Sequence, residues 1–159
     1  MIDPVQADCP VLVNMLDEPA GSDAVVDAVV LEVIENDPAA LQSLMPFITQ
    51  WVRAARAARP ELSVMLVSHG NESLTLAHEP DSVLSRQLET LGDNQALSVS
   101  VCGTYAGWRG LSPADFPDYL QVLDSADSAL TRQRAAGALI VRLRPASAAK
   151  PDDMGFPEY

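Results

Sequence analysis

Basic residues are scarce in this chain, and the first of them is Arg53. The 159 residues include 10 Lys and Arg against 22 Asp and Glu, which gives a net charge of −12, and nine of the acidic residues precede Arg53. A nucleic-acid-binding protein needs a basic surface to neutralise phosphates, and an anionic membrane surface likewise attracts basic segments. We therefore expect neither nucleic acid nor a membrane to be a partner.

Long apolar runs are also missing. No uninterrupted apolar stretch approaches the roughly 18 residues that a membrane-spanning helix requires. A secretory signal starts with a basic segment, and the absence of Lys and Arg before Arg53 excludes that pattern here. The sequence therefore predicts a soluble, cytoplasmic protein.

Cysteine occurs only as Cys9 and Cys102, which is too few for a disulfide scaffold and lacks the C-x-x-C spacing of zinc and thioredoxin-like sites. In a reducing compartment both are expected to be free thiols. A metal site built from His69, His78 and Cys102 would lack a fourth ligand. A GxSxG motif for a serine nucleophile is absent as well. We expect neither a metal nor an organic cofactor.

Length and composition predict one globular domain with two flanking segments. With 48% hydrophobic and 20% charged residues, the chain can bury a sizeable core. Several prolines and an acidic stretch mark residues 1–23 as an extension, within which residues 11–13 allow a short edge strand. The domain is expected to cover residues 24–144, and the Pro-, Ala- and Asp-rich residues 145–159 are expected to form a flexible tail.

Strand and helix patterns alternate along this domain. Nearly continuous β-branched runs are typical of strands covered on both faces, and apolar residues spaced by three and four indicate amphipathic helices. The predicted strands are residues 24–34, 62–67, 97–101, 119–123 and 138–143. The predicted helices are residues 38–59 with a kink or split at Pro46, residues 71–91 with an interruption at Pro80, the short stretch 111–116, and residues 125–135. The alternation predicts an α/β fold with a five-stranded, mainly parallel sheet and helices on both faces, and it leaves the strand order open.

Cys102 is the first candidate for chemistry. It ends an apolar run, and Gly103 and Arg109 lie in the turn that follows, which contains three glycines within eight residues. Open α/β sheets bind ligands beyond the carboxyl ends of their strands, so a thiol there would face a crevice. The turn amides and the Arg109 guanidinium would favour the reactive thiolate. The alternative is a buried cysteine that packs as a small hydrophobic residue.

Two further side chains are candidates at the same edge of the sheet. His69 follows the second predicted strand and is either a base or anion contact near Cys102, or an exposed turn histidine that bonds its own backbone. Trp108 is either a packing anchor or a contact with a neighbouring subunit or partner.

The motifs around these candidates follow one another in a recognisable order. They are a strand ending in Ser68-His69-Gly70, a helix broken by proline, Val99-Ser100-Val101-Cys102 followed after six residues by Arg109-Gly110, a strand, a helix, Gly137 and a last strand. This order resembles the DsrE/DsrF-like family of sulfur-relay proteins, which includes the TusD-type carriers, over residues 24–143. The stretch 103–108 departs from the alanine-rich stretch of TusD-like members, and the acidic extension is not a feature of the family.

The resemblance implies a flavodoxin-like three-layer sandwich, assembled as a homotrimer or homohexamer with the cysteine loop near a subunit interface. It also implies a persulfide on Cys102, which accepts sulfane sulfur from a donor and passes it to an acceptor, each a protein or a small thiol. In this scheme Arg109 stabilises the thiolate, the amides of Gly103 and Thr104 hold the persulfide anion, and His69 assists.

Two other functions remain open at this point. The first is a non-catalytic oligomeric module that binds a small anion or a partner protein in the same crevice through Trp108 and Arg109. The second is a thiol redox sensor that uses both cysteines, with Cys9 as a thiol that resolves a disulfide on Cys102.

Overall fold

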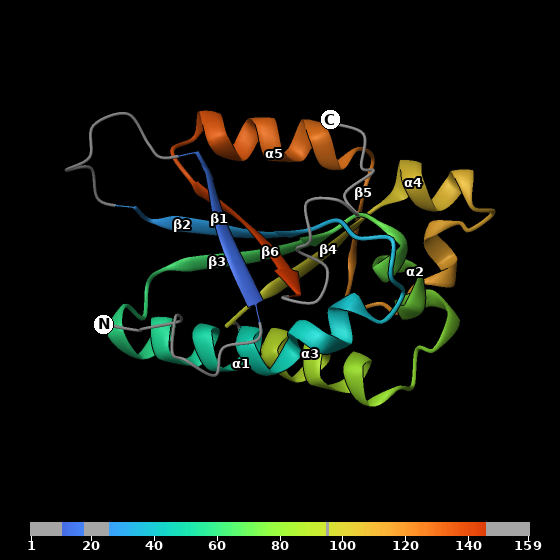
Figure 1. The fold of residues 1–159 in the computed structure, drawn as a ribbon, viewed down its shortest axis with the longest axis horizontal. Coiled ribbons are helices and arrows are strands. Elements are labelled where there is room, and N and C mark those ends of the chain that lie inside the picture. The colour runs from blue at the N-terminus through green and yellow to red at the C-terminus, as the bar shows by residue number, and fades with distance from the viewer. Residues whose placement is uncertain (1–10, 18–25, 95, 146–159) are drawn as a thin grey trace.

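A six-stranded sheet forms the centre of the computed structural model, which describes residues 11–17, 26–94 and 96–145. The strands run in the order β1-β6-β2-β3-β4-β5 (Figure 1). Their bounds are Val11–Asp17 (β1), Ala28–Val33 (β2), Ser63–Ser68 (β3), Ser98–Cys102 (β4), Gln121–Leu123 (β5) and Leu139–Pro145 (β6). Strands β2 to β6 are parallel, which confirms the predicted sheet, and β1 adds a sixth, antiparallel strand at the edge beside β6.

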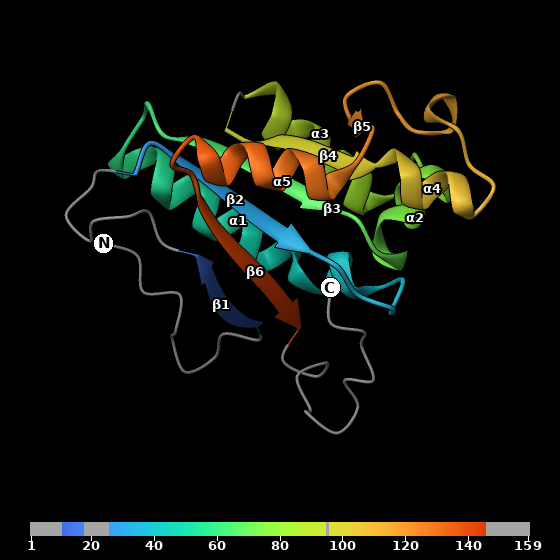
Figure 2. The same ribbon diagram turned by 90° about the horizontal axis from the view of Figure 1, so that it is seen from above.

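Helices cover both faces of this sheet, as the alternating pattern predicts. Their bounds are Ala40–Ala58 (α1), Asn71–His78 (α2), Val83–Asp93 (α3), Gly103–Trp108 (α4) and Ala126–Ala135 (α5), with a short 3-10 turn at Pro113–Asp115. Helix α5 lies on one face, and α1 and α3 lie on the other (Figures 1 and 2). Helices α2 and α4 directly follow β3 and β4, so they lie at the carboxyl end of the sheet.

Two local features differ from the sequence-based expectation. Helix α1 continues through Pro46, so the predicted split does not occur. Pro46 and Gln42, whose carbonyl loses its helical N–H partner, are both exposed, and water can therefore replace the missing donor. The other difference is α4, a short helix where the sequence predicts a glycine-flanked turn.

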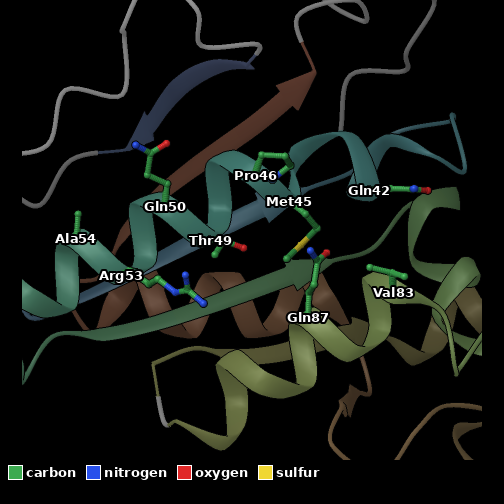
Figure 3. Close-up of a pocket in the computed structure, with 9 residues that line it drawn as sticks. All are labelled: Gln42, Met45, Pro46, Thr49, Gln50, Arg53, Ala54, Val83 and Gln87. Atoms are coloured by element: carbon green, nitrogen blue, oxygen red, sulfur yellow. The ribbon is translucent and has the colours of Figure 1, made fainter.

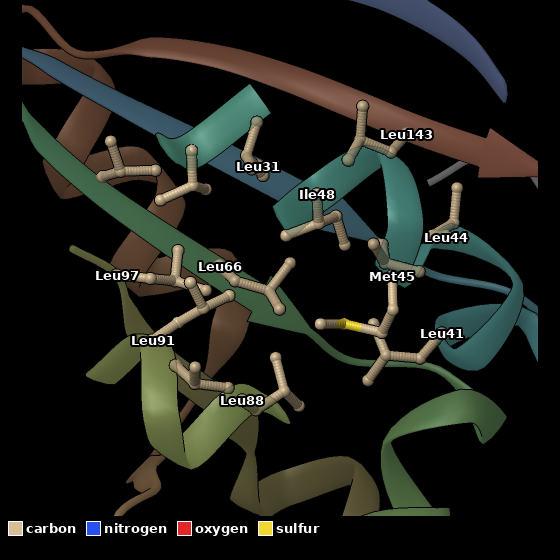
Figure 4. Close-up of a cluster of buried hydrophobic side chains, with 14 of the residues drawn as sticks. Leu31, Leu41, Leu44, Met45, Ile48, Leu66, Leu88, Leu91, Leu97 and Leu143 are labelled. Atoms are coloured by element: carbon tan, nitrogen blue, oxygen red, sulfur yellow. The ribbon is translucent and has the colours of Figure 1, made fainter. Parts of the chain in front are cut away.

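The core consists of two apolar clusters separated by the sheet. The larger one fills the space between the sheet and helices α1 and α3 (Figure 4), and the smaller one lies beneath α5. Alternation along β2 shows how one strand serves both, because Val30 belongs to the α5 cluster and Leu31 to the other. Cys102 belongs to the α5 cluster, so its side chain lies on the same face of the sheet as Val30.

A fully buried carboxylate joins the carboxyl ends of β2 and β3. Glu72 accepts hydrogen bonds from the Glu35 N–H at 2.8 Å, the Ser68 hydroxyl at 2.8 Å and the Gly70 N–H at 3.0 Å. Burial raises the pKa of Glu72 above its usual 4.5, because these three donors are uncharged and compensate only partly for lost hydration. Glu72 thereby holds the segment that contains His69 against the end of β2.

Gly70 allows this close approach of backbone segments. A Cβ atom at Gly70 would lie 2.6 Å from the Glu35 N and O atoms and from Glu72 Oε1. We therefore expect Gly70→Ala to lower the free energy of unfolding by about 1–3 kcal/mol, measured by urea denaturation. Gly107→Ala is the control, because among the described residues its Cβ would meet nothing within 4 Å. Equal stability of the two variants would contradict this interpretation.

Candidate functional site

A cavity of about 410 Å³ lies at the carboxyl ends of the parallel strands, beside α4 and α5. Open α/β sheets bind ligands at this position. The side chains in its lining that carry chemistry are Glu32, His69, Cys102, Arg134 and Arg142. The cavity therefore brings a thiol, an imidazole and two guanidinium groups together.

A larger groove of about 780 Å³ lies between α1 and α3 (Figure 3). The described residues in its lining are Gln, Thr, Met, Pro, Ala, Val and Arg53, without a nucleophilic or acidic side chain. We place the chemistry in the smaller cavity, because it holds the thiol together with groups that can transfer a proton or bind an anion.

Cys102 occupies the boundary between the α5 cluster and the cavity. It is the last residue of β4 and the N-cap of α4, and its Sγ atom accepts the Tyr105 N–H at 3.5 Å. The residue is only 7% exposed, in keeping with a packed cysteine, yet it also lines the cavity. Cys102 therefore lies in the wall of the cavity, at its contact with the α5 cluster.

His69 lies beside Cys102 because of the strand register. The pairing of β3 with β4 ends at Ser68 and Val101, so the next residues along the two strands are His69 and Cys102. His69 is buried rather than an exposed turn residue, and its Nε2–H donates to Glu32 Oε2 at 2.7 Å. The thiol and the imidazole therefore share one wall of the cavity, as the positions of the predicted strand ends indicate.

Glu32 is a buried carboxylate that the sequence reasoning missed. It lies within β2, opposite Arg142 of β6, whose Nη2 donates to Glu32 Oε2 at 3.3 Å. Burial raises the pKa of Glu32, but the hydrogen bond from His69 and the charge of Arg142 outweigh burial and hold the pKa below 4.5. Glu32, His69 and Arg142 form a hydrogen-bonded trio at the cavity wall. A charged residue inside an otherwise apolar strand was the available signal.

Of the residues predicted to surround Cys102, Thr104 and Trp108 line the cavity, whereas Gly103 packs against β5. A Cβ at Gly103 would lie 2.8 Å from the Leu123 carbonyl oxygen. Thr104 lines the cavity, and its hydroxyl donates to the Asp124 carbonyl. Trp108 also lines the cavity but is 77% exposed.

The Arg109 guanidinium binds Asn71 and Tyr105, not Cys102. Its Nη2 donates to Asn71 Oδ1 at 3.0 Å and to the Tyr105 hydroxyl at 3.1 Å, and the guanidinium stacks 5.4 Å from the centre of the Tyr105 ring. Helix α4 causes this placement, because it carries Arg109 away from the end of β4. Arg109 is not among the described residues that line the cavity, and the guanidinium groups that do are those of Arg134 and Arg142.

Several expectations concern residues outside the described part of the chain. These are the role of Cys9, most of the acidic extension, and the tail at residues 146–159. Within the described ranges, no three His, Cys, Asp or Glu residues are grouped so that they could hold a metal ion. None of the helices described is long and apolar enough to cross a membrane.

Comparison with solved structures gives a match to a protein of unknown function, MTH1491 from Methanobacterium thermoautotrophicum. The TM-score is 0.61 at 20% sequence identity, and the match covers 72% of this chain and 97% of that chain. At this identity the similarity shows the fold alone: an α/β fold with a five-stranded parallel sheet and helices packed on it, in the order β5-β4-β3-β2-β6 here. No family model matches the sequence, and no curated protein matches it.

Proposed function

We propose that Cys102 carries sulfane sulfur as a persulfide, as the resemblance to the DsrE/DsrF-like family implies. The Cys102 thiolate attacks the outer sulfur of a donor persulfide, a new S–S bond forms at Cys102, and the donor leaves as a thiolate. An acceptor thiolate then attacks the outer sulfur of the Cys102 persulfide and releases the Cys102 thiolate. Neither step requires an external oxidant or reductant, because one sulfur atom moves between thiolates.

The observation that carries this proposal is the position of Cys102 in a cavity wall shared with the hydrogen-bonded trio of Glu32, His69 and Arg142. A thiolate or persulfide anion needs donors and positive charge nearby. The Tyr105 N–H already donates to Cys102 Sγ, and the guanidinium groups among the described lining residues are those of Arg134 and Arg142 rather than that of Arg109. His69 directly follows the neighbouring strand β3 and is level with Cys102. In this scheme it exchanges a proton with the incoming or leaving thiol.

The proposal extends to partners, assembly and location. Donor and acceptor are proteins or small thiols in the cytoplasm, and the chain assembles as a homotrimer or homohexamer with the cavity near a subunit interface. We assign Trp108 to that interface, because a tryptophan that is largely exposed at the rim of a cavity is typical of a contact residue.

The test is the mass of the protein after incubation with a persulfide donor. Wild type and Cys9→Ser should each gain one sulfur atom, about 32 Da, which an acceptor thiol removes. Cys102→Ser should gain none. An adduct that persists in Cys102→Ser, or a wild type that never gains one, would refute the assignment of Cys102.

A further inference from the structure

Arg142 presents its positive charge to the cavity, whereas its carboxylate partner lies beneath it. The side chain of Arg142 is 20% exposed and that of Glu32 is 4% exposed, although the two are joined at 3.3 Å. Glu32 also accepts the His69 N–H at 2.7 Å, so this one carboxylate positions two basic side chains. A ligand that enters the cavity therefore meets the Arg142 guanidinium before it meets the Glu32 carboxylate.

The other charged groups in the cavity lining are Arg134 and Asp127, both on α5. Asp127 lies in the first turn of the helix and Arg134 in its last turn, and both are exposed. The lining thus holds two guanidinium groups and an imidazole against one buried and one exposed carboxylate. In a chain with a net charge of −12, a lining in which two guanidinium groups balance two carboxylates is less acidic than the chain as a whole.

The strand order sets the distance between Arg142 and the thiol. Arg142 is on β6 and Cys102 on β4, with β2 and β3 between them. Neighbouring strands lie about 4.8 Å apart, so the two strands are about 14 Å apart across three spacings. Arg142 is level with Ser100, two residues before Cys102, which adds to the separation. The long Arg142 side chain covers part of that distance. A ligand that reacts at Cys102 and reaches Arg142 carries its anionic group several bonds from its sulfur.

We propose that Arg142, held by Glu32, is an anion-binding side chain of the Cys102 cavity, and that the ligand is a low-molecular-weight thiol or persulfide with a carboxylate or similar anionic group. A cavity of about 410 Å³ has the size of a small-molecule site. The inference rests on the proposed function for the sulfur of this ligand. The negative charge of the ligand is inferred from the residues that line the cavity, independently of sulfur transfer.

The experiment compares alkylation of Cys102 by maleimidocaproate, whose carboxylate lies several bonds from the reacting carbon, and by its neutral amide, which has the same length. In a Cys9→Ser background Cys102 is the only thiol. The rate constant of the anionic reagent is divided by that of the neutral one. This ratio is then divided by the same ratio for a free small thiol. This normalised ratio should exceed one, and Arg142→Gln should lower it about fivefold, because the guanidinium that the carboxylate of the probe reaches is lost.

Arg132→Gln is the matched control, because Arg132 is an exposed arginine of α5 outside the lining of this cavity. It should leave the ratio unchanged. A second measurement needs no variant at the trio: added salt should slow maleimidocaproate and leave the rate of its neutral amide unchanged. A ratio of one or below, or rates with equal salt dependence, would overturn the anion site.

These outcomes are separable from failure of the proposed function. Alkylation requires only a reachable thiol and involves no sulfane sulfur. A high ratio that depends on Arg142, without the mass adduct, would retain the anion site and reject sulfur transfer. An adduct on Cys102 with a ratio of one would retain sulfur transfer and reject an anionic small-molecule ligand in favour of a neutral or protein donor.

Discussion

Replacement of Glu72 by alanine is expected to lower the free energy of unfolding by about 3–5 kcal/mol. The fully buried carboxylate accepts the Glu35 N–H, the Gly70 N–H and the Ser68 hydroxyl, and alanine leaves all three without this acceptor. Each buried donor left unsatisfied costs about 1–3 kcal/mol, and water that enters the new cavity recovers part of that. Urea denaturation followed by circular dichroism measures the change.

A surface glutamate supplies the control for this prediction. Glu61→Ala removes a carboxylate whose side chain is 71% exposed, and it should change stability by no more than about 0.5 kcal/mol. A loss below about 1 kcal/mol for Glu72→Ala would mean that other groups satisfy the three donors, and that Glu72 does not hold the ends of β2 and β3 together.

The second large effect is expected at the buried ion pair between Glu35 and Arg144, whose Nε donates to Glu35 Oε2 at 3.0 Å. Arg144→Met would leave a buried carboxylate without this guanidinium, which typically costs about 3–5 kcal/mol at neutral pH. The double variant Glu35→Gln/Arg144→Met should recover more than half of that loss, because neither charge remains buried. Urea unfolding of both variants tests this, and equal destabilisation of the two would contradict the ion-pair explanation.

The loss in Arg144→Met should depend on pH in a definite direction. Burial already raises the pKa of Glu35 above 4.5, although Arg144 opposes the shift, so removal of Arg144 raises that pKa further. The folded variant then binds a proton at higher pH than the folded wild type does. Its deficit in stability is therefore full above the raised pKa and shrinks as the pH falls toward 4.5. Urea unfolding of the wild type and Arg144→Met from pH 7 to pH 4.5 should show the difference between their free energies of unfolding becoming smaller.

Glu32 and Glu35 are close in sequence, and each is buried and paired with an arginine of β6, yet their pKa values move in opposite directions. Glu32 has two basic partners, which outweigh its desolvation, whereas desolvation dominates at Glu35. Only Glu32 is among the described residues that line the Cys102 cavity. Of the two ion pairs, the one with Glu35 is therefore structural, and the one with Glu32 lies at the wall of the cavity.

The parts of the candidate site that local sequence could predict are those that follow from strand ends. Cys102 and His69 each terminate an apolar run, and parallel strands bring such ends to one edge. Glu32 and Arg142 could not be found in this way, because they are 110 residues apart and meet only where β6 pairs with β2. Arg109 shows the converse, since it is close to Cys102 in sequence but lies against Asn71 and Tyr105.

The sequence by itself determined the alternation of strands and helices, the mainly parallel sheet and the position of the thiol at a strand end. Hydrophobic periodicity and capping residues are local signals, so they can be identified before the chain is folded. Tertiary structure alone decided the strand order, the helix that moves Arg109 away, and the buried carboxylate that positions His69 and Arg142. The physical reason is that pairing between distant strands selects which charges are desolvated together, and a charge is retained in a core only where such a partner meets it.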